Sequence, residues 1–102
     1  MSSDQELEAL RMKIADLDLR IVRAVAQRMR LASKIGRIKS MKGLDIESRE
    51  VEEIVLKRAR DKAAELGLEQ ELVDRIFALL IDYSKRQQRK EVDNAPHRDL
   101  GA

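Results

Sequence analysis

The stretch QELEALRMKIADLDLRIVRAVAQRMRLASKIGRIKSM, residues 5–41, decides the fold of this 102-residue chain. It contains no proline, and its only glycine is Gly36. Its apolar side chains recur at steps of three and four residues, with one step of seven: Leu7, Leu10, Ile14, Leu17, Ile21, Ala24, Leu31, Ile35 and Ile38. This spacing is a heptad seam, and it predicts one long α-helix that packs along a partner helix.

A helix of this length cannot be covered by the rest of the chain. About 35 helical residues at ~1.5 Å each span roughly 50 Å. A compact domain of about 100 residues, by contrast, has a radius of gyration near 13 Å. Much of the seam must therefore pack on a second copy of the chain, and the sequence predicts a homodimer.

Two shorter helices are predicted after a connector at residues 42–45. Gly43 is expected to cap the long helix at its C-terminus. Asp45 and Ser48 are both suitable N-caps for the second helix, and the spacing does not decide between them. That helix is expected to run to about Leu66, where Gly67 ends it.

A third helix is predicted from about Glu69 to Lys90. The predicted organisation is therefore all-α, with one helical domain at residues 1–90 and a disordered tail at residues 91–102. The tail contains Pro96 and lacks apolar periodicity. His97 lies in this tail without a partner for catalysis or metal binding, and we assign it no role.

The composition limits the functional classes. Charged residues reach 39% and aromatic residues 2%, which is typical of helices rather than strands. The chain has no cysteine, which excludes disulfides and thiolate metal sites, and no long apolar run, so we expect no membrane span and a cytoplasmic location. The sequence also offers no catalytic triad or metal-ligand cluster, and we expect no metal and no cofactor. The 21 basic and 19 acidic residues are mixed along the chain, which gives no reason to expect nucleic acid or a membrane surface as partner.

Arg28 interrupts the apolar seam, seven residues after Ile21 and seven before Ile35. A guanidinium in a coiled-coil core is costly unless something satisfies it, although register-setting or snorkelling explains it equally well. Lys39 lies three helical turns beyond Arg28, about 16 Å along the same face. Two cations on one face suggest a bound anion. A lysine in the last turn also suits the helix dipole.

The third helix carries a similar anomaly. Phe77, Leu80 and Ile81 define its buried stripe, and Ser84 and Gln88 continue that stripe with hydrogen-bonding groups. A fraying helix end whose inner face turns polar would look the same. The abrupt change nevertheless suits recognition of oxygen atoms on a ligand.

Arg49 and Glu50 fall in the first turn of the second helix. The helix dipole explains a glutamate there but not an arginine. An arginine at a helix N-terminus suits a nearby anion, because the free backbone N–H groups also point to it. Both residues are therefore candidates for the same anion site.

Five local strings occur in order along the chain: LEALRMKI (7–14), AQRMRLA (26–32), GRIK (36–39), SRE (48–50) and DYSKRQQ (82–88). Together with three helices of these lengths, they resemble the all-helical chorismate mutases. The resemblance covers roughly residues 7–89. Each string alone is weak, but their order and spacing are specific to this family.

The resemblance implies an intertwined six-helix homodimer whose long helices run antiparallel. It also implies that each active site takes Arg11 from the partner chain. The geometry agrees, because seventeen residues, about 25 Å of helix, separate Arg11 from Arg28. A single chain cannot bring both residues to one small ligand, whereas an antiparallel partner can.

The implied reaction is the intramolecular rearrangement of chorismate to prephenate in phenylalanine and tyrosine biosynthesis. It requires neither nucleophile nor metal, and its substrate carries two carboxylates. By resemblance, Arg28 and Arg11 from the partner chain hold the carboxylates, with help from Arg49 and Ser84. These residue types suit carboxylate binding, since arginine binds carboxylates in a bidentate fashion.

The resemblance also implies that Lys39 and Gln88 flank the ether oxygen, and that Glu50 accepts a hydrogen bond from the ring hydroxyl. One position departs from the family pattern. Members often carry an acidic residue three positions before the Arg-Glu pair, and Ile46 occupies that position here. Because Asp45 is adjacent, the connector could be shifted by one residue.

Two other functions compete with the mutase. An isochorismate–pyruvate lyase shares the fold and most of the cationic site, and Glu50 favours the mutase over it. A non-enzymatic helical dimer, serving as an adaptor, would give no reason for Arg28, Lys39 and Gln88 to occur as a set. The sequence leaves open whether the domain docks onto another enzyme of the aromatic pathway.

Overall fold

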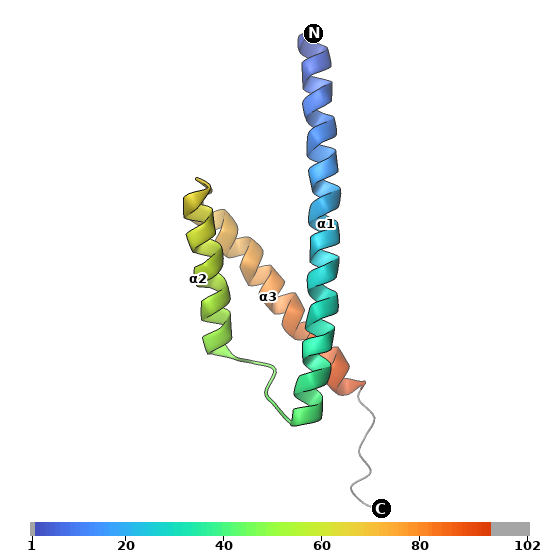
Figure 1. Ribbon diagram of the computed structural model, residues 1–102, viewed down its shortest axis with the longest axis vertical. Helices are drawn as coiled ribbons and strands as arrows, with labels where there is room; N and C mark the ends of the chain where they lie inside the picture. The colour runs from blue at the N-terminus through green and yellow to red at the C-terminus, as the bar shows by residue number, and fades with distance from the viewer. Residues whose placement is uncertain (1, 95–102) are drawn as a thin grey trace, which may run out of the picture.

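The computed structural model describes residues 2–94 of the chain, which form three α-helices and no strand. The helices are α1 (Ser3–Lys42), α2 (Arg49–Glu65) and α3 (Gln70–Asp93), so the predicted all-α class is confirmed. The first half of α1 projects well beyond α2 and α3 (Figure 1). The radius of gyration is 19.1 Å, against near 13 Å for a compact domain of about this length.

Both ends of α1 carry recognisable caps. At the N-terminus, the Ser2 hydroxyl accepts a hydrogen bond from the Gln5 backbone N–H, and the Gln5 side chain accepts one from the Ser2 backbone N–H. This is a capping box. At the C-terminus, Gly43 adopts the left-handed conformation with φ of 66°, as the sequence predicts.

The N-cap of α2 is Ser48, whose hydroxyl accepts a hydrogen bond from the Val51 backbone N–H. This observation decides between Asp45 and Ser48, which the sequence left open. The choice matters because the position of the cap fixes which side chains of α2 face the rest of the molecule. At the other end, Gly67 follows the helix with φ of 72°.

The third helix continues to Asp93, past the predicted end at Lys90. Its last turn is tied to α1 by an ion pair between Arg37 and Glu91, whose closest atoms are 3.4 Å apart. The residues of the predicted tail beyond Asn94, His97 among them, lie outside the described residues.

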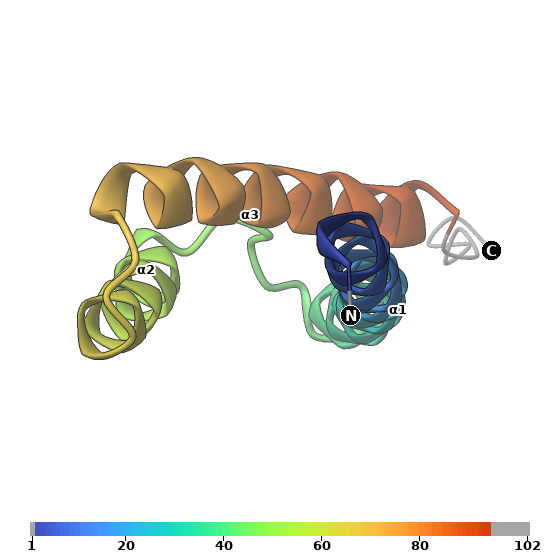
Figure 2. The ribbon, with the colours of Figure 1, turned by 90° about the horizontal axis from the view of Figure 1, so that it is seen from above.

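The C-terminal half of α1 and the whole of α2 lie on the same side of α3 (Figures 1 and 2). The helices α1 and α3 approach each other closely at Gly36, where an added Cβ would lie 2.8 Å from the Gln88 Cα. Only glycine permits this contact. The buried apolar side chains of the described chain are small, namely Ala32, Ala63 and Val73. The helices of one chain therefore enclose very little core.

The seam of α1 is exposed in a single chain. Its large apolar side chains in the N-terminal half are between 46% and 59% exposed: Leu7, Leu10, Ile14, Leu17 and Ile21. Soluble chains rarely leave so long an apolar stripe uncovered, and such a stripe marks an interaction surface. No helix within residues 2–94 is long and apolar enough to cross a membrane.

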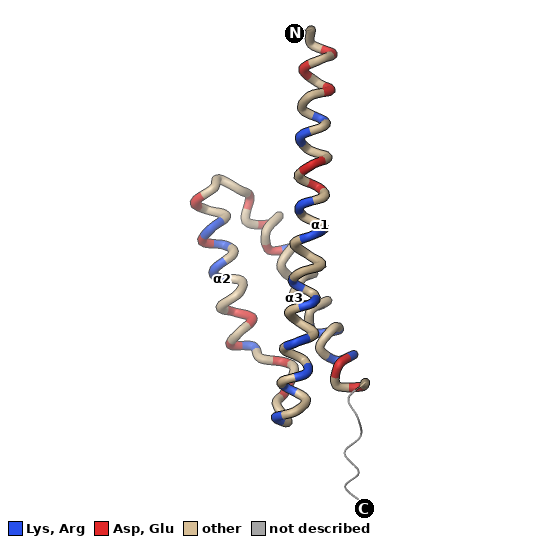
Figure 3. Tube along the Cα trace, turned by 45° about the vertical axis from the view of Figure 1, so that its right-hand side comes forward, with Lys and Arg blue, Asp and Glu red and all other residues tan. Residues whose placement is uncertain are grey.

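Charge is divided unevenly along α1 (Figure 3). Its first part, up to Asp18, carries five acidic and two basic residues. From Leu19 to the end of the helix the charged residues are all basic: Arg20, Arg23, Arg28, Arg30, Lys34, Arg37, Lys39 and Lys42. The even mixture seen over the whole chain therefore does not hold within this helix.

Candidate active site

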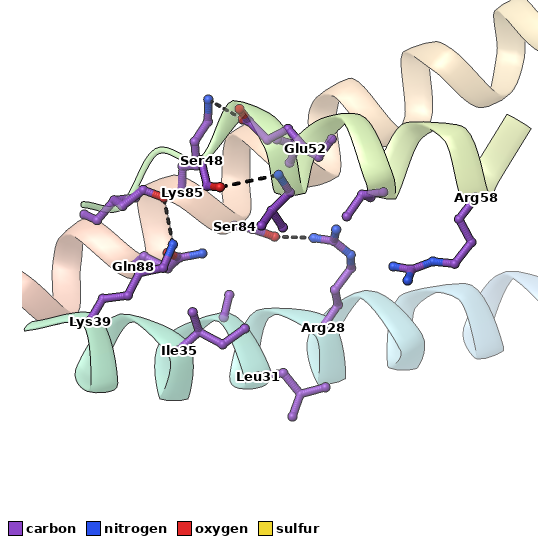
Figure 4. Close-up of a pocket in the computed structure, with 15 residues that line it drawn as sticks. Arg28, Leu31, Ile35, Lys39, Ser48, Glu52, Arg58, Ser84, Lys85 and Gln88 are labelled. Atoms are coloured by element: carbon purple, nitrogen blue, oxygen red, sulfur yellow. Dashed lines mark hydrogen bonds and ion pairs between the residues drawn. The ribbon is translucent and has the colours of Figure 1, made fainter. Parts of the chain in front are cut away.

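The three helices enclose one pocket of about 360 Å³ at the basic half of α1 (Figure 4). This volume lies within the range of small-molecule sites. Its floor is apolar, and the charged groups on its wall are four cations and one carboxylate: Arg28, Lys39, Arg58, Lys85 and Glu52. Such a pocket suits a small anionic ligand with an apolar body.

Arg28 lies half-buried at the middle of this pocket. Its guanidinium donates hydrogen bonds to the Leu80 carbonyl, at 3.1 Å, and to the Ser84 hydroxyl. Burial lowers the pKa of Arg28, and the nearby charge of Arg58 lowers it further. Arginine nevertheless stays protonated in proteins. The side chain is thus a fixed cation, held by α3, with further N–H groups to offer.

Lys39, in the last turn of α1, lines one end of the pocket, opposite the end at Arg58 (Figure 4). Its ammonium donates a hydrogen bond of 2.8 Å to the backbone carbonyl of Ile46. This bond joins the connector between α1 and α2 to the pocket wall. Since an ammonium has three N–H groups, two remain available to a ligand.

Ser84 and Gln88 face the pocket from α3 and are each 8% exposed. The structure thus brings Arg28, Lys39, Ser84 and Gln88 together, as the sequence predicts. The Gln88 Oε1 atom is buried and has no hydrogen-bond partner within residues 2–94. A buried polar atom without a partner costs about 1–3 kcal/mol. The amide therefore retains unused hydrogen-bonding capacity at the pocket wall.

Arg49 and Glu50, which the resemblance assigns to the site, do not line this pocket in the single chain. Both side chains are exposed, and Arg49 borders a shallower depression between α2 and α3 that shares Glu52 and Ile81 with the pocket. The reason is the phase of α2. The helix begins directly after Ser48, so the turn of about 100° per residue directs the next two side chains away.

Glu52 lines the pocket from α2, two residues after Glu50. Its carboxylate accepts from the Lys85 ammonium at 2.8 Å, and Glu47 accepts from the same ammonium at 3.2 Å. Hydrogen bonds to Glu52 and then to Glu47 raise the pKa of Lys85 above its usual value. The pair joins α2 to α3 and leaves Glu52 fixed at the pocket wall.

Sequence reasoning missed four polar residues of the pocket: Ser48, Glu52, Arg58 and Lys85. The wall formed by the N-cap and α2 comprises Ser48, Val51, Glu52, Val55 and Arg58, and Lys85 lines the pocket from α3. The signal was present in the spacing, because steps of three and four residues from Ser48 define one helical face. This face could be identified only once Ser48, and not Asp45, was known to be the N-cap of α2.

Arg11 lies far from the pocket of its own chain, on the projecting half of α1. Its side chain is 65% exposed, and its only ion pair within the described chain is with Glu8, at 3.8 Å. The pocket of one chain therefore lacks Arg11, in keeping with the separation from Arg28 that the sequence indicates.

The fold and the pocket define an all-α protein with a cationic small-molecule site. Residues 10–89 match the family described as chorismate mutase type II. The chain is 26% identical over 95 residues to a chorismate mutase of Methanocaldococcus jannaschii, covering 93% of this chain and 96% of that protein. It is 32% identical over 77 residues to the T-protein of Haemophilus influenzae, covering 76% of this chain and 20% of that protein.

The chain therefore belongs to the chorismate mutase type II family. The name of the family and of the archaeal relative denotes an isomerase, and this chain is an enzyme of that class. The match covers all of α2 and most of α1 and α3.

Proposed function

We propose that this chain converts chorismate to prephenate in the pocket between its three helices. The observation that carries the proposal is the convergence of Arg28, Lys39, Ser84 and Gln88 on one cavity, from two helices of a family member. Residues 1–90 would form the catalytic domain, and α3 extends that unit to Asp93. The archaeal relative, whose length this chain almost fully covers, is itself called a chorismate mutase.

The pocket suits this reaction because the reaction needs positioning rather than a chemical group from the protein. One C–O bond breaks while one C–C bond forms within the same molecule, and no proton has to be transferred. The substrate is a dicarboxylate, which matches the cationic wall of the pocket. Holding the reacting arm over the ring converts binding energy into a favourable geometry.

The transition state is stabilised at the end of the pocket where Lys39 and Gln88 lie. Negative charge grows on the ether oxygen as the C–O bond lengthens, and both side chains offer N–H groups there. Their bonds to that oxygen strengthen as the charge develops. Such differential stabilisation is what raises the rate.

We propose Glu52, beside Glu50, as a carboxylate that can accept a hydrogen bond from the ring hydroxyl of chorismate. Glu52 is the acidic residue among those that line the pocket, and its carboxylate pairs with the Lys85 ammonium. Either glutamate favours a mutase over an isochorismate–pyruvate lyase.

The active enzyme is proposed to be a homodimer in which α1 of one chain lies antiparallel to α1 of the other. The support is the apolar seam, exposed from Leu7 to Ile21, which a second copy would cover. An antiparallel arrangement also places the projecting half of one α1 beside the basic half of the other. Arg11 of the partner subunit would then reach the carboxylates held by Arg28.

The charges of α1 favour this antiparallel orientation. Acidic residues occur only in the first half of the helix: Asp4, Glu6, Glu8, Asp16 and Asp18. The charged residues of the second half are all basic. An antiparallel pair sets each acidic half against a basic half, whereas a parallel pair would set the two basic halves together.

The test is prephenate formation by the purified chain. Chorismate and isochorismate are supplied separately, and the products are resolved by chromatography. We expect prephenate from chorismate, no pyruvate from isochorismate, and loss of activity in Arg28→Ala. Pyruvate release from isochorismate alone would replace the mutase by the lyase, and inactivity on both substrates would refute the proposal.

A further inference from the structure

Arg58 occupies the pocket without a function in the reaction as proposed above. It lies in the third turn of α2, on the face that begins at Ser48, and it lines the pocket. Its guanidinium points across the pocket toward Arg28 (Figure 4). The residue is exposed in the single chain, so its guanidinium is accessible to a ligand.

The neighbouring cations of α2 are occupied, whereas Arg58 is not. Lys57 pairs with Asp61 at 2.8 Å, Arg60 with Asp74 at 2.6 Å and Lys62 with Glu65 at 3.0 Å. No carboxylate within residues 2–94 lies within 4 Å of the Arg58 guanidinium. Of these four cationic residues of α2, Arg58 is the one that lines the pocket, and it has no ion pair within residues 2–94.

Two guanidinium groups that face each other repel. The charge of Arg58 contributes, after burial, to lowering the pKa of Arg28. An anion placed between the two groups would convert the repulsion into two attractions. Because each guanidinium presents several N–H groups in a plane, both can bind the same carboxylate.

The position of Arg58 also specifies which end of a ligand it would bind. Lys39 and Gln88 lie at the opposite end of the pocket, with Arg28 and Ser84 between them and Arg58 (Figure 4). A ligand whose ether oxygen lies at Lys39 would therefore present a carboxylate to Arg28 and Arg58.

We infer that Arg58 is a substrate-binding residue that shares with Arg28 one carboxylate of a small dicarboxylate substrate. This inference rests on the proposed function and deepens it. Arg58, in the third turn of α2, would then be the second arginine from the same chain that binds the carboxylate. The resemblance gave this role to Arg49. A contact of this kind holds the substrate equally in the ground and transition states, so it acts on KM rather than kcat.

The test compares Arg58→Gln and Arg58→Lys with Arg75→Gln, in which an exposed arginine paired only with Glu71 on the same helix is changed in the same way. We expect KM for chorismate to rise by about ten- to a hundredfold in Arg58→Gln, with kcat within about threefold, as for loss of a charge-assisted hydrogen bond. Arg58→Lys, which keeps the charge without the fork, should give an intermediate KM. Arg75→Gln should match the wild type.

A second readout separates this inference from the proposed function. Thermal unfolding is followed with and without a bicyclic dicarboxylate that mimics the transition state. Suppose that the wild type is inactive on chorismate, but that the dicarboxylate raises the unfolding temperature of the wild type and not that of Arg58→Gln. In that case the inference about Arg58 stands and the proposed function fails. Equal KM and equal stabilisation in Arg58→Gln and Arg75→Gln would overturn the inference. So would a changed dimer dissociation constant with unchanged KM, since Arg58 would then bind the partner chain.

Discussion

Replacing Gly36 by alanine perturbs the contact that sets the distance between α1 and α3. The new Cβ would lie 2.8 Å from the Gln88 Cα and 3.0 Å from the Gln88 carbonyl oxygen. An ordinary contact of this kind is 3.4–4 Å long, so the helices must separate by roughly 0.6–1.2 Å. Both obstructing atoms are backbone, and a rotamer change cannot relieve the clash.

The separation should affect activity more than stability. Overpacking costs about 1–3 kcal/mol, and the higher helix propensity of alanine returns about 1 kcal/mol, which leaves a net loss of roughly 0–2 kcal/mol. Displacing a positioned group by about 1 Å can cost on the order of 10²-fold in rate. Because Gln88 moves with the backbone that Gly36 contacts, we expect kcat to fall by about that factor.

The assay is kcat for prephenate formation, together with the urea midpoint for unfolding. Gly67→Ala provides the control, because Gly67 has φ of 72° and an added Cβ there meets nothing within 4 Å. That variant should lose about 1–2 kcal/mol to backbone strain and retain its kcat. The reasoning is refuted if Gly36→Ala keeps kcat within about threefold of the wild type while its stability falls as calculated.

Three further predictions concern the pocket. Lys39→Ala should lower kcat by at least about 10²–10³-fold with its circular dichroism unchanged. The control Lys34→Ala changes an exposed residue of the same helix and should keep its kcat. Normal turnover in Lys39→Ala would exclude Lys39 from the mechanism. Glu52→Gln should reduce kcat/KM for chorismate at least about tenfold more than Glu50→Gln, since of the two residues Glu52 lines the pocket. The reverse order would identify Glu50 as the residue that binds the ring hydroxyl, as the resemblance implies. The amide of Gln88 does not titrate, so kcat should vary less than about threefold between roughly pH 6 and 8, and a steep ionisation in the pH–rate profile would require another donor at the ether oxygen.

Much of the fold could be predicted from the sequence because it depends on local patterns. The heptad spacing from Leu7 to Ile38 predicts α1, and Gly43 predicts its end. The polar residues that interrupt apolar stripes, Arg28 and Ser84 among them, also predict where a pocket lies. Each of these residues belongs to a long helix whose phase many apolar positions define together.

The second helix shows why the remainder of the site could not be predicted. Its phase depends on the N-cap, and Asp45 and Ser48 were equally suitable by chemistry. The family pattern then directed attention to Arg49 and Glu50, which lie outside the pocket of the single chain. The face from Ser48 to Arg58 lines this pocket because of how α2 packs against α3, which is not a local property.

The central claim is that two chains share each active site, with Arg28 from one and Arg11 from the other. It is tested most directly by mixing Arg11→Ala and Arg28→Ala, each inactive alone, and allowing subunits to exchange. Random exchange makes about half of the dimers mixed, and in each mixed dimer one site carries both substitutions while the other carries neither. Activity on chorismate should therefore return to about a quarter of the wild-type value. Complete exchange without recovered activity would contradict the shared site.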